Sequence, residues 1–459
     1  MTRDATVLAT LAAYNLLLLA MGIWASSRNR DNRDFLLAGG RMGGWIAGLS
    51  ASASSSSAWT LLGVSGSAYL WGHQALWLLP ATLGGFLINW VWVAPRLQRV
   101  ARSEGALTLT AVVAPATLGR ARVPIMRVAS VIIVFCFSFY IAAQFDGAGK
   151  AFAENFGWSQ SVSILVGAAV VAAYTMVGGF WAVSVTDALQ ALLMVFVAIV
   201  LPALVLFAGV DGGTPAPPRL THASTPIAIG FALGTLGIGL GYPGQPHVVS
   251  RFMALRDHQA LIKGRRVAVI WAVLVYSGML TLGIAARRLG LGVADGEAVL
   301  FAAANAVLPP VAAGLVLAAV LAAIMSTADS QLLTAAGSIA YDWRGNAADA
   351  AHAPTLTRAV VLLVCVAAVG LAIGLPQDIF SRVLFAWHAI GSAFGPLLVA
   401  RLLGYQPGAG RTLASMLIGF ALTVVFHAQP NAPGDWIERL VPLALAGLVL
   451  IGTRRAPAA

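Results

Sequence analysis

Thirteen apolar runs follow one another along the chain, and each is long enough to cross a membrane as a helix. A hydrocarbon core of about 30 Å takes roughly 20 helical residues. Only 10% of the 459 residues are charged, compared with about 25% in soluble proteins, which excludes a soluble fold. We therefore predict an all-α polytopic membrane protein that forms a single transmembrane domain. The predicted spans are residues 5–26, 42–71, 74–95, 126–152, 159–177, 183–209, 225–247, 267–287, 309–340, 359–375, 379–402, 411–428 and 436–453.

The basic residues predict how these spans are oriented. When the N-terminus is placed outside, 21 of the 28 Lys and Arg residues fall in or beside the predicted cytoplasmic segments, as the positive-inside rule requires. An odd number of spans then places the C-terminus in the cytoplasm. Topology thus explains the net charge of +11, and no nucleic-acid partner is needed. Arginines follow the first apolar run, at Arg28, Arg30 and Arg33, so we interpret it as a retained helix of a bacterial-type plasma (inner) membrane protein.

Two predicted spans contain segments that cannot form a regular helix. The span at 42–71 has the serine-rich segment Ser50–Ala58 in its middle, and the span at 225–247 contains Gly237–Pro246, with two prolines and four glycines. Free backbone groups at membrane depth are tolerated where they line a cavity or bind a ligand. We therefore expect a binding site at these two breaks.

The order of the broken spans indicates an internal repeat. They are the second and seventh spans, so each opens a block of five, at residues 42–209 and 225–402. Because five is odd, the second block enters the membrane from the opposite side, as in secondary transporters built from inverted repeats. Residues 1–41, with the first helix and a cytoplasmic loop, and residues 411–459 would be peripheral.

Hydroxyl-bearing residues near the breaks are candidates for a cation site. The Ser50–Ala58 segment offers hydroxyls and free carbonyls, and the adjacent Ser326 and Thr327 can direct both hydroxyls toward one neighbouring helix. Small hydroxyl residues also occur simply where membrane helices pack closely, and for an isolated pair that interpretation is the better one. The serine run in the other half of the chain favours an ion site instead.

Three acidic residues, Asp146, Asp187 and Asp329, lie within or at the edge of predicted spans. Intramembrane acids are costly and usually functional. Lys150, four residues after Asp146, could instead form a helical ion pair with it. Asp187 follows a Gly-Gly pair at a predicted helix start, where it could complement the helix dipole. We expect Asp329, one turn beyond Ser326, to hydrate an ion exit path or to cap nearby backbone.

Nucleotide and catalytic motifs do not fit their required contexts. The glycines of 239–244 match a dinucleotide-binding pattern, but no strand precedes them and no helix follows as that motif needs. The chain contains no phosphate-binding loop and no grouped His, Asp and Ser set of the kind a hydrolase uses. We therefore expect neither an enzyme nor an ATP-driven pump.

Four stretches, at residues 34–41, 174–190, 241–253 and 322–331, resemble the sodium:solute symporter family and in particular its sodium/proline symporters. The resemblance implies a LeuT-type core of five plus five helices, with Na+ as the coupled ion and a small solute such as proline as the substrate. It implies a sodium site formed by the carbonyls of Ala53, Ser56 and Ala323 and the hydroxyls of Ser326 and Thr327. It places the substrate beside Ser57, Ala58, Tyr140, Ile238, Tyr242 and Pro246, and it places Asp187 along the sodium exit route. We assign Asp329 to the same route from its own position, one turn beyond Ser326.

Four positions depart from the pattern of the proline branch. That branch usually has an acid at Ser55, a methionine at Ser56, a glycine at Ala58 and a tryptophan at Ile238. The missing acid is expected to weaken sodium binding, and the altered pocket wall leaves another small organic acid open as the substrate. Two further alternatives are a transporter-like sensor with a separate signalling partner, and proton coupling through Asp146, Asp187 or Asp329. The oligomeric state is left open.

Overall fold

The computed structural model describes residues 3–26, 37–176, 179–208, 225–343, 353–375, 378–429 and 432–455, and within these ranges it contains helices and no strand. Arg28, Arg30 and Arg33 lie outside the described residues. The α-helices are α1 (Arg3–Ser26), α3 (Gly44–Ser54), α4 (Val64–Trp71), α5 (Leu78–Leu87), α6 (Ala94–Glu104), α7 (Leu109–Val113), α8 (Arg122–Phe156), α9 (Gln160–Thr175), α10 (Phe180–Phe207), α11 (Thr225–Gly237), α12 (Pro246–Ala254), α13 (His258–Arg288), α14 (Val299–Val307), α15 (Pro310–Gly337), α16 (Ala353–Gly374), α17 (Ile379–Leu402), α18 (Ala409–His427) and α19 (Trp436–Leu448).

Ten helical segments in the described ranges are long and apolar enough to cross a membrane. The all-helical, multi-pass prediction is confirmed, but the count of about thirteen spans is not. Part of the difference is length, because α9 and α19 have only 16 and 13 residues. Another part is that the chain from Trp59 to Glu104 forms one 46-residue helical stretch. Gly72 interrupts that stretch between α4 and α5, with φ 60° and ψ −131°.

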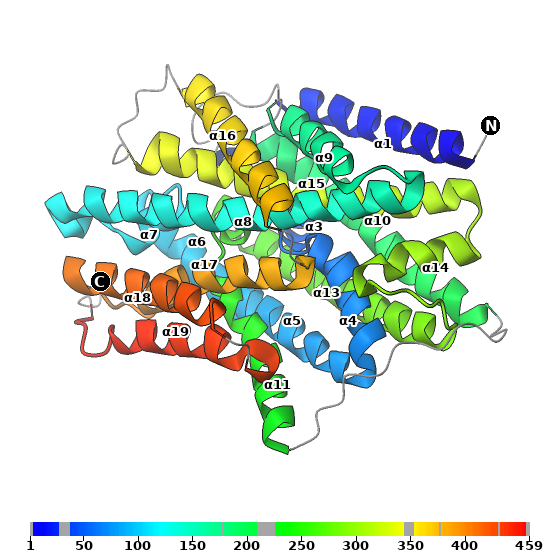
Figure 1. The fold of residues 1–459 in the computed structure, drawn as a ribbon. Coiled ribbons are helices and arrows are strands. Elements are labelled where there is room, and N and C mark those ends of the chain that lie inside the picture. The colour runs from blue at the N-terminus through cyan, green and yellow to red at the C-terminus, as the bar shows by residue number, and fades with distance from the viewer. Residues whose placement is uncertain are drawn as a thin grey trace.

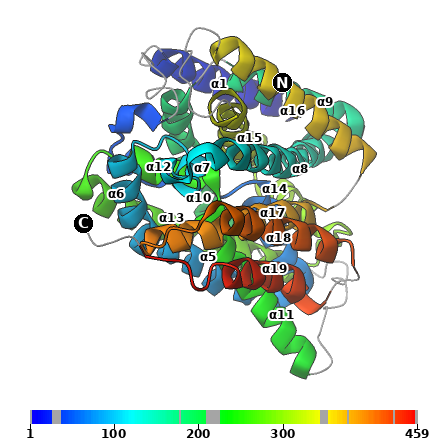
Figure 2. The same cartoon turned by 90° about the vertical axis from the view of Figure 1, so that its left-hand side faces the viewer.

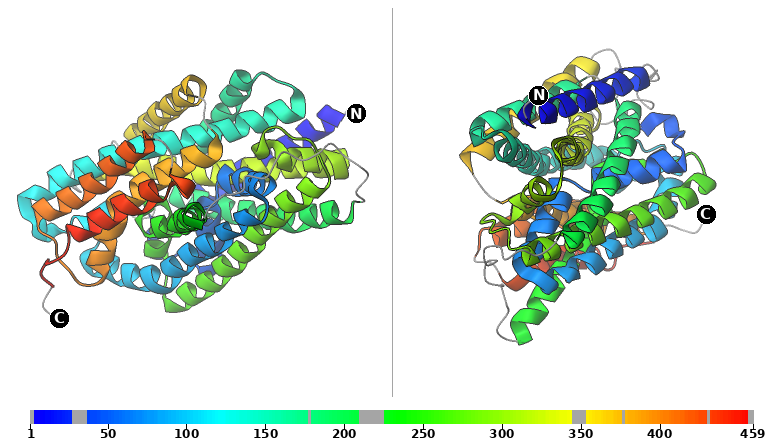
Figure 3. Two further views of the ribbon diagram at one scale, coloured as in Figure 1. Left: turned by 60° about the horizontal axis from the view of Figure 1, so that its bottom comes forward. Right: turned by 90° about the vertical axis from the view of Figure 1, so that its right-hand side faces the viewer.

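The helices form a central group flanked by two outer groups (Figures 1 and 2). In the centre α3 packs against α10, α13 and α15, and α8 packs against α15 and α17. On one side lie α1, α9 and α16, and on the other α11, α18 and α19. The two views in Figure 3 show these outer groups on opposite faces of the molecule. This arrangement encloses α15 and α17 and leaves the outer helices to face the lipid.

Glycines allow the backbone of α17 to approach the chain around the second predicted break. A Cβ atom built on Gly244 would lie 2.7 Å from Cα of Gly391, and one on Gly391 would lie 2.9 Å from Cα of Gly241. Small residues at such crossings are typical of membrane helices, which associate largely through close packing. The contact fixes α17 against the segment that follows α11.

Both predicted breaks are present in the structure. The first is narrower than Ser50–Ala58, because α3 extends to Ser54 and only residues 55–57 leave the helical path before η2 (Trp59–Gly63) begins. At the second break α11 ends at Gly237 and is followed by the 3-10 turn η6 (Ile238–Gly244). Gln245 is extended, with φ −87° and ψ 103°, before α12 starts. The serine run thus forms mostly regular helix, whereas the Gly/Pro-rich segment leaves the α-helical path from Ile238 to Gln245.

Candidate functional site

Four of the five residues predicted to bind sodium lie together where α3 ends beside α15. The Ser326 hydroxyl donates to the carbonyl oxygens of Ala53, at 3.3 Å, and Ala323, at 3.2 Å. The Thr327 hydroxyl lies 3.4 Å from the same Ala53 oxygen. All four residues are fully buried. The group therefore presents two carbonyl and two hydroxyl oxygens, the ligand type that hard cations prefer.

The fifth residue, Ser56, is joined to this group through its backbone. Its N–H donates to the Ala53 carbonyl at 3.0 Å. Its hydroxyl lies 3.4 Å from that of Tyr276 on α13, which is also 3.4 Å from Thr60 and from Tyr242. Tyr276 thus connects the two breaks. Sequence reasoning missed it, because a tyrosine within an apolar run gives no signal of its own.

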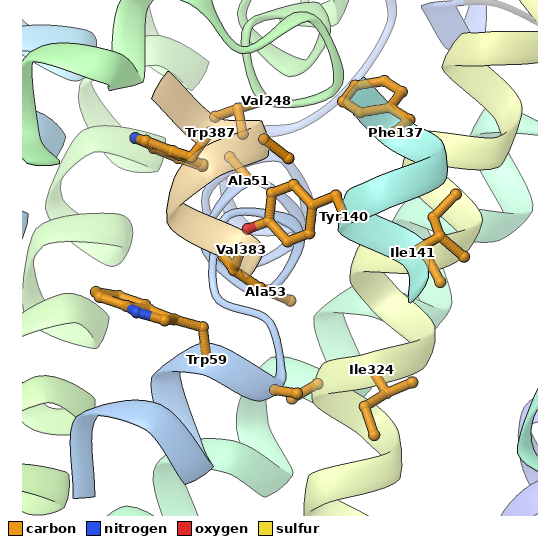
Figure 4. Close-up of a cluster of buried hydrophobic side chains, with 14 of the residues drawn as sticks. Ala51, Ala53, Trp59, Phe137, Tyr140, Ile141, Val248, Ile324, Val383 and Trp387 are labelled. Atoms are coloured by element: carbon orange, nitrogen blue, oxygen red, sulfur yellow. The ribbon is translucent and has the colours of Figure 1, made fainter. Parts of the chain in front are cut away.

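Three of the residues predicted to bind substrate gather around Trp387 of α17. Its indole N–H donates to the Ile238 carbonyl at 3.1 Å, and its ring contacts that of Tyr242 at a centroid distance of 4.7 Å. Tyr140 approaches the same indole, with ring centroids 6.5 Å apart. Figure 4 shows the Tyr140 ring directed from α8 toward the first break. Trp387 was also missed by sequence reasoning.

Ser57 and Ala58 form the start of the helix after the first break. The Ser57 hydroxyl accepts the N–H of Trp59 at 3.1 Å. The N–H of Ala58 donates to the side-chain oxygen of Gln144 on α8 at 2.9 Å. The Ala58 N–H lies at a helix N-terminus and has no partner within its own helix, so Gln144 serves as its acceptor. Such a position also suits an anionic group. No motif marked Gln144 in the sequence.

Pro246 is placed differently from the other predicted substrate residues. It is the first residue of α12 and lines a small cavity together with Phe180 and Ser250. The preceding Gln245 donates its side-chain amide to the carbonyls of Gly241, at 3.1 Å, and Trp387, at 2.8 Å. Pro246 is thus linked to the aromatic group through Gln245.

Asp187 lies within a buried polar network and not at a helix start. It is two turns inside α10, and its Oδ2 accepts hydrogen bonds from Ser50 at 2.7 Å, Ser54 at 3.1 Å and Arg251 at 3.0 Å. The helix-dipole interpretation of this residue is therefore wrong. Arg251, which the sequence placed in a cytoplasmic basic segment, is only 1% exposed. It belongs to α12 and faces the protein interior.

Ser330 connects this network to the candidate sodium site. Its hydroxyl lies 2.6 Å from Arg251, 3.0 Å from Ser54 and 2.8 Å from the Ser326 carbonyl. It also lies 3.3 Å from Oδ1 of Asp329, the neighbouring residue on α15. In the described part of the chain, Oδ1 of Asp187 and Oδ2 of Asp329 have no hydrogen-bond partner. A continuous path of oxygens therefore leads from Ser326 to the two acids.

Asp146 and Lys150 do not pair with each other, so the alternative of a helical ion pair between them is wrong. Asp146 pairs with Arg382 of α17. Lys150 contacts Glu297 and Asp295, each at 2.6 Å. Glu297 lies in η7 (Gly296–Ala298) and also accepts the backbone N–H groups of Ile379 and Phe380 at the start of α17. These acids and bases join α8, η7 and α17.

Comparison with known proteins identifies the class to which this architecture belongs. The model of the sodium:solute symporter family matches residues 35–419. The chain belongs to the sodium:solute symporter family. Among its relatives, an osmoregulated proline transporter of Bacillus subtilis is 30% identical, with 98% of this chain and 96% of that protein covered. The sodium/proline symporter of Haemophilus influenzae is 33% identical, with coverages of 97% and 93%.

Solved structures support the same fold. A Na+-coupled sialic acid symporter in a substrate-bound, outward-open state matches with a TM-score of 0.77 at 17% identity, covering 97% of this chain and 96% of that one. The inward-facing conformation of Mhp1 matches with a TM-score of 0.53 at 13% identity, with coverages of 89% and 90%. The relatives are transporters, which confirms the expectation of a transport protein and not an enzyme. Bacterial relatives, together with the ten apolar helices of the described residues, identify a multi-pass inner-membrane protein.

Proposed function

We propose that the chain carries a small solute into the cell together with sodium, and that proline is the first substrate to test. One observation carries the proposal: two adjacent hydroxyls of α15, on Ser326 and Thr327, meet the carbonyl of Ala53 at the end of α3. A sodium ion bound there would link the first broken helix to α15. The names of the relatives, several of which are proline transporters, support the choice of substrate.

The proposed sodium ligands are the carbonyls of Ala53, Ser56 and Ala323 and the hydroxyls of Ser326 and Thr327. Because the two halves of this site come from different predicted repeats, a bound ion favours the arrangement in which α3 and α15 are close together. An ion can shift a conformational equilibrium only by its difference in affinity for the two states. Sodium would therefore stabilise one conformation of the substrate site. The sodium ion and the substrate would both leave when α3 and α15 separate.

The proposed substrate site lies between the two breaks, next to Ser57, Ala58, Tyr140, Ile238 and Tyr242, with Pro246 at its far edge. The N–H of Ala58, now bound to Gln144, suits a substrate carboxylate. The aromatic rings of Tyr242 and Trp387 suit an apolar ring such as that of proline. We further propose that sodium leaves along the oxygens of Asp187 and Asp329.

The repeat architecture belongs to the same proposal. Residues 42–209 and 225–402 would form two inverted five-helix blocks, and residues 1–41 and 411–459 would be peripheral. Thirteen spans, with the N-terminus outside and the C-terminus in the cytoplasm, agree with the positions of the basic residues. The two breaks meet through Tyr276, as helices at the centre of an inverted repeat would.

The test is uptake of radiolabelled proline into proteoliposomes, with an inward gradient of sodium or of choline. Wild type is expected to take up proline faster with sodium, and Thr327→Ala to lose that stimulation. Thr423→Ala is the matched control, because Thr423 is equally buried but bonds only to its own helix, at the Gly419 carbonyl. Unchanged sodium dependence in Thr327→Ala would rule out the proposed ion site. Equal wild-type uptake in choline would rule out sodium coupling, and a pH gradient would then test proton coupling.

A further inference from the structure

An apolar groove of about 560 Å³ opens on the outside of the bundle between α17 and α19. Its walls include Val399 and Leu403 of α17 and Leu443 and Leu450 of the C-terminal segment. These walls offer few hydrogen-bonding groups, and the helices that form them are predicted spans. Because lipid tails are as apolar as leucine, hydrocarbon is the natural content of such a groove in a bilayer.

The floor of the groove is the outer side of the second break. Leu240 and Pro243, both in η6, line it. Tyr242, between them in the sequence, packs against Trp387 and approaches the hydroxyl of Tyr276. One short segment of irregular backbone thus separates the groove from the proposed substrate site. Whatever fills the groove also supports η6 from outside.

One mouth of the groove carries three exposed arginines, one near the start of α18 and two in the chain after α19. Arg411 donates to the carbonyl of Ile451 at 3.2 Å, and Arg455 lies 4.9 Å from the ring centre of Tyr405. Both Ile451 and Tyr405 line the groove. Arg454 directly precedes Arg455 in the chain after α19. Guanidinium groups bind phosphate through paired hydrogen bonds, and basic clusters at the ends of spans attract anionic lipids.

We propose that this groove binds one acyl chain of an anionic phospholipid, whose phosphate is held by Arg411, Arg454 and Arg455. An apolar channel that ends at a cationic mouth matches the two parts of such a lipid. A second apolar groove, between α18 and α19, is lined by residues such as Leu417, Ala421 and Leu445 and by no arginine, so it offers no place for a headgroup. The bound lipid packs against η6 and stabilises the second break.

Glycines in open positions allow the groove to be filled without disturbing the backbone. A Cβ atom on Gly447, in the groove wall, would meet no atom within 4 Å, so Gly447→Trp places its indole in the groove. Gly370 on α16 is equally open, and Gly370→Trp is the matched control. Ala444→Leu is a milder filling variant, for use if Gly447→Trp does not fold. The double variant Arg454→Gln/Arg455→Gln leaves the apolar walls intact and removes charge.

The full chain is reconstituted in phosphatidylcholine with phosphatidylglycerol, extracted into mild detergent and weighed by native mass spectrometry. Wild type and Gly370→Trp are expected to retain one phosphatidylglycerol, whereas Gly447→Trp and Ala444→Leu retain less than a tenth as much. The double arginine variant is expected to lose the preference for phosphatidylglycerol over phosphatidylcholine. Equal retention by the filled and control variants would overturn the proposal, as would an arginine variant that keeps the preference. None of these readouts requires transport.

Discussion

Arg251 and Asp187 form a buried ion pair, in which a guanidinium nitrogen lies 3.0 Å from a carboxylate oxygen. The two side chains are 1% and 0% exposed. Ser50 bonds to both partners, donating to the carboxylate at 2.7 Å and accepting from Arg251 at 3.1 Å. The pair therefore ties α12, which follows the second break, to α10. The Ser50 hydroxyl adds α3, which precedes the first break.

Removing one partner of this pair is expected to destabilise the protein strongly. Breaking a buried ion pair from one side costs about 3–5 kcal/mol, because the other charge stays buried without compensation. Arg251→Gln and Asp187→Asn should each lower the free energy of unfolding by this amount. The double variant should lose less than the sum, because neither charge is then left alone. Unfolding is measured by denaturant titration in mild detergent.

The exposed pair Arg256–Asp257 provides the control for this comparison. Its side chains are 65% and 41% exposed, and a guanidinium nitrogen lies 2.7 Å from the carboxylate. Surface pairs contribute about 0–1 kcal/mol, so Arg256→Gln should have little effect. If Arg251→Gln proved as mild as Arg256→Gln, the Arg251–Asp187 pair could not be holding α12 to α10.

The hydroxyl of Thr327, and not its bulk, is expected to determine sodium dependence. Thr327→Val keeps the shape of the side chain but removes the oxygen that approaches Ala53 at 3.4 Å. Thr327→Ser keeps the oxygen and removes a methyl group. The sodium concentration for half-maximal uptake should rise at least tenfold in the valine variant and change less than threefold in the serine variant. Similar values for the two variants would show that packing alone matters at this position.

The contact between Gly244 and α17 is expected to tolerate no added methyl group. A Cβ on Gly244 would lie 2.7 Å from the Gly391 Cα and carbonyl oxygen, and backbone atoms cannot move aside as a side chain can. Overpacking of this kind costs about 1–3 kcal/mol. Gly244→Ala should therefore lower the unfolding free energy, whereas Gly84→Ala, at which no atom lies within 4 Å, should not. Equal stability of the two variants would contradict the tight contact.

The breaks could be predicted from the sequence because their causes are local. Prolines and glycines at 237–246 remove helical hydrogen bonds wherever the segment lies, and Ser326 and Thr327 are neighbours on one helix. The length of the first break could not be predicted. Serines fit within a helix when their hydroxyls form hydrogen bonds elsewhere. Ser50 and Ser54 both donate to Asp187, which is more than 130 residues away in the sequence.

Partners that come from distant helices left no signal in the sequence. Trp387, Tyr276 and Gln144 lie in apolar or polar surroundings that look ordinary one segment at a time. Helical spacing alone offered Asp146 as a partner for Lys150, but Glu297 and Asp295, more than 140 residues away in the sequence, lie close to it in space. The sequence placed Arg251 in a cytoplasmic loop, because a basic residue that follows an apolar run usually lies in one. Only the tertiary structure brings it to Asp187.

The stability of the end that contains η7 is expected to depend on pH through Glu297, which lies outside the predicted spans. Burial raises the pKa of this carboxyl above its ordinary value of 4.5, and Lys150 opposes the rise. The folded protein therefore binds the proton more tightly than the unfolded chain, so stability falls as pH rises from about 4.5 through the raised value. In Glu297→Gln the side chain cannot titrate, so this pH dependence is absent. The unfolding temperature of wild type relative to Glu297→Gln should therefore decrease with rising pH, and parallel curves would contradict the assignment.

An acid introduced at Ser55 is expected to strengthen sodium binding. Ser55 lies two residues after Ala53, is 4% exposed, and donates its hydroxyl to the Ser52 carbonyl at 3.0 Å. A carboxylate there would attract a cation held at Ala53, and at an effective dielectric constant of about 20 the gain at 6 Å is roughly 3 kcal/mol before desolvation is subtracted. Ser55→Asp should therefore lower the half-maximal sodium concentration for uptake several-fold. Ser55→Asn, of the same size but uncharged, should not.

The same substitution gives a second readout that does not involve transport. Without sodium, the new carboxylate is buried near other oxygens and uncompensated, so Ser55→Asp should be less stable than wild type. An ion that binds only the folded state stabilises that state by mass action. Added sodium should therefore raise the unfolding temperature of Ser55→Asp more than that of wild type, while equal additions of choline leave both unchanged. If sodium and choline acted alike on Ser55→Asp, the cation site could not lie beside Ala53.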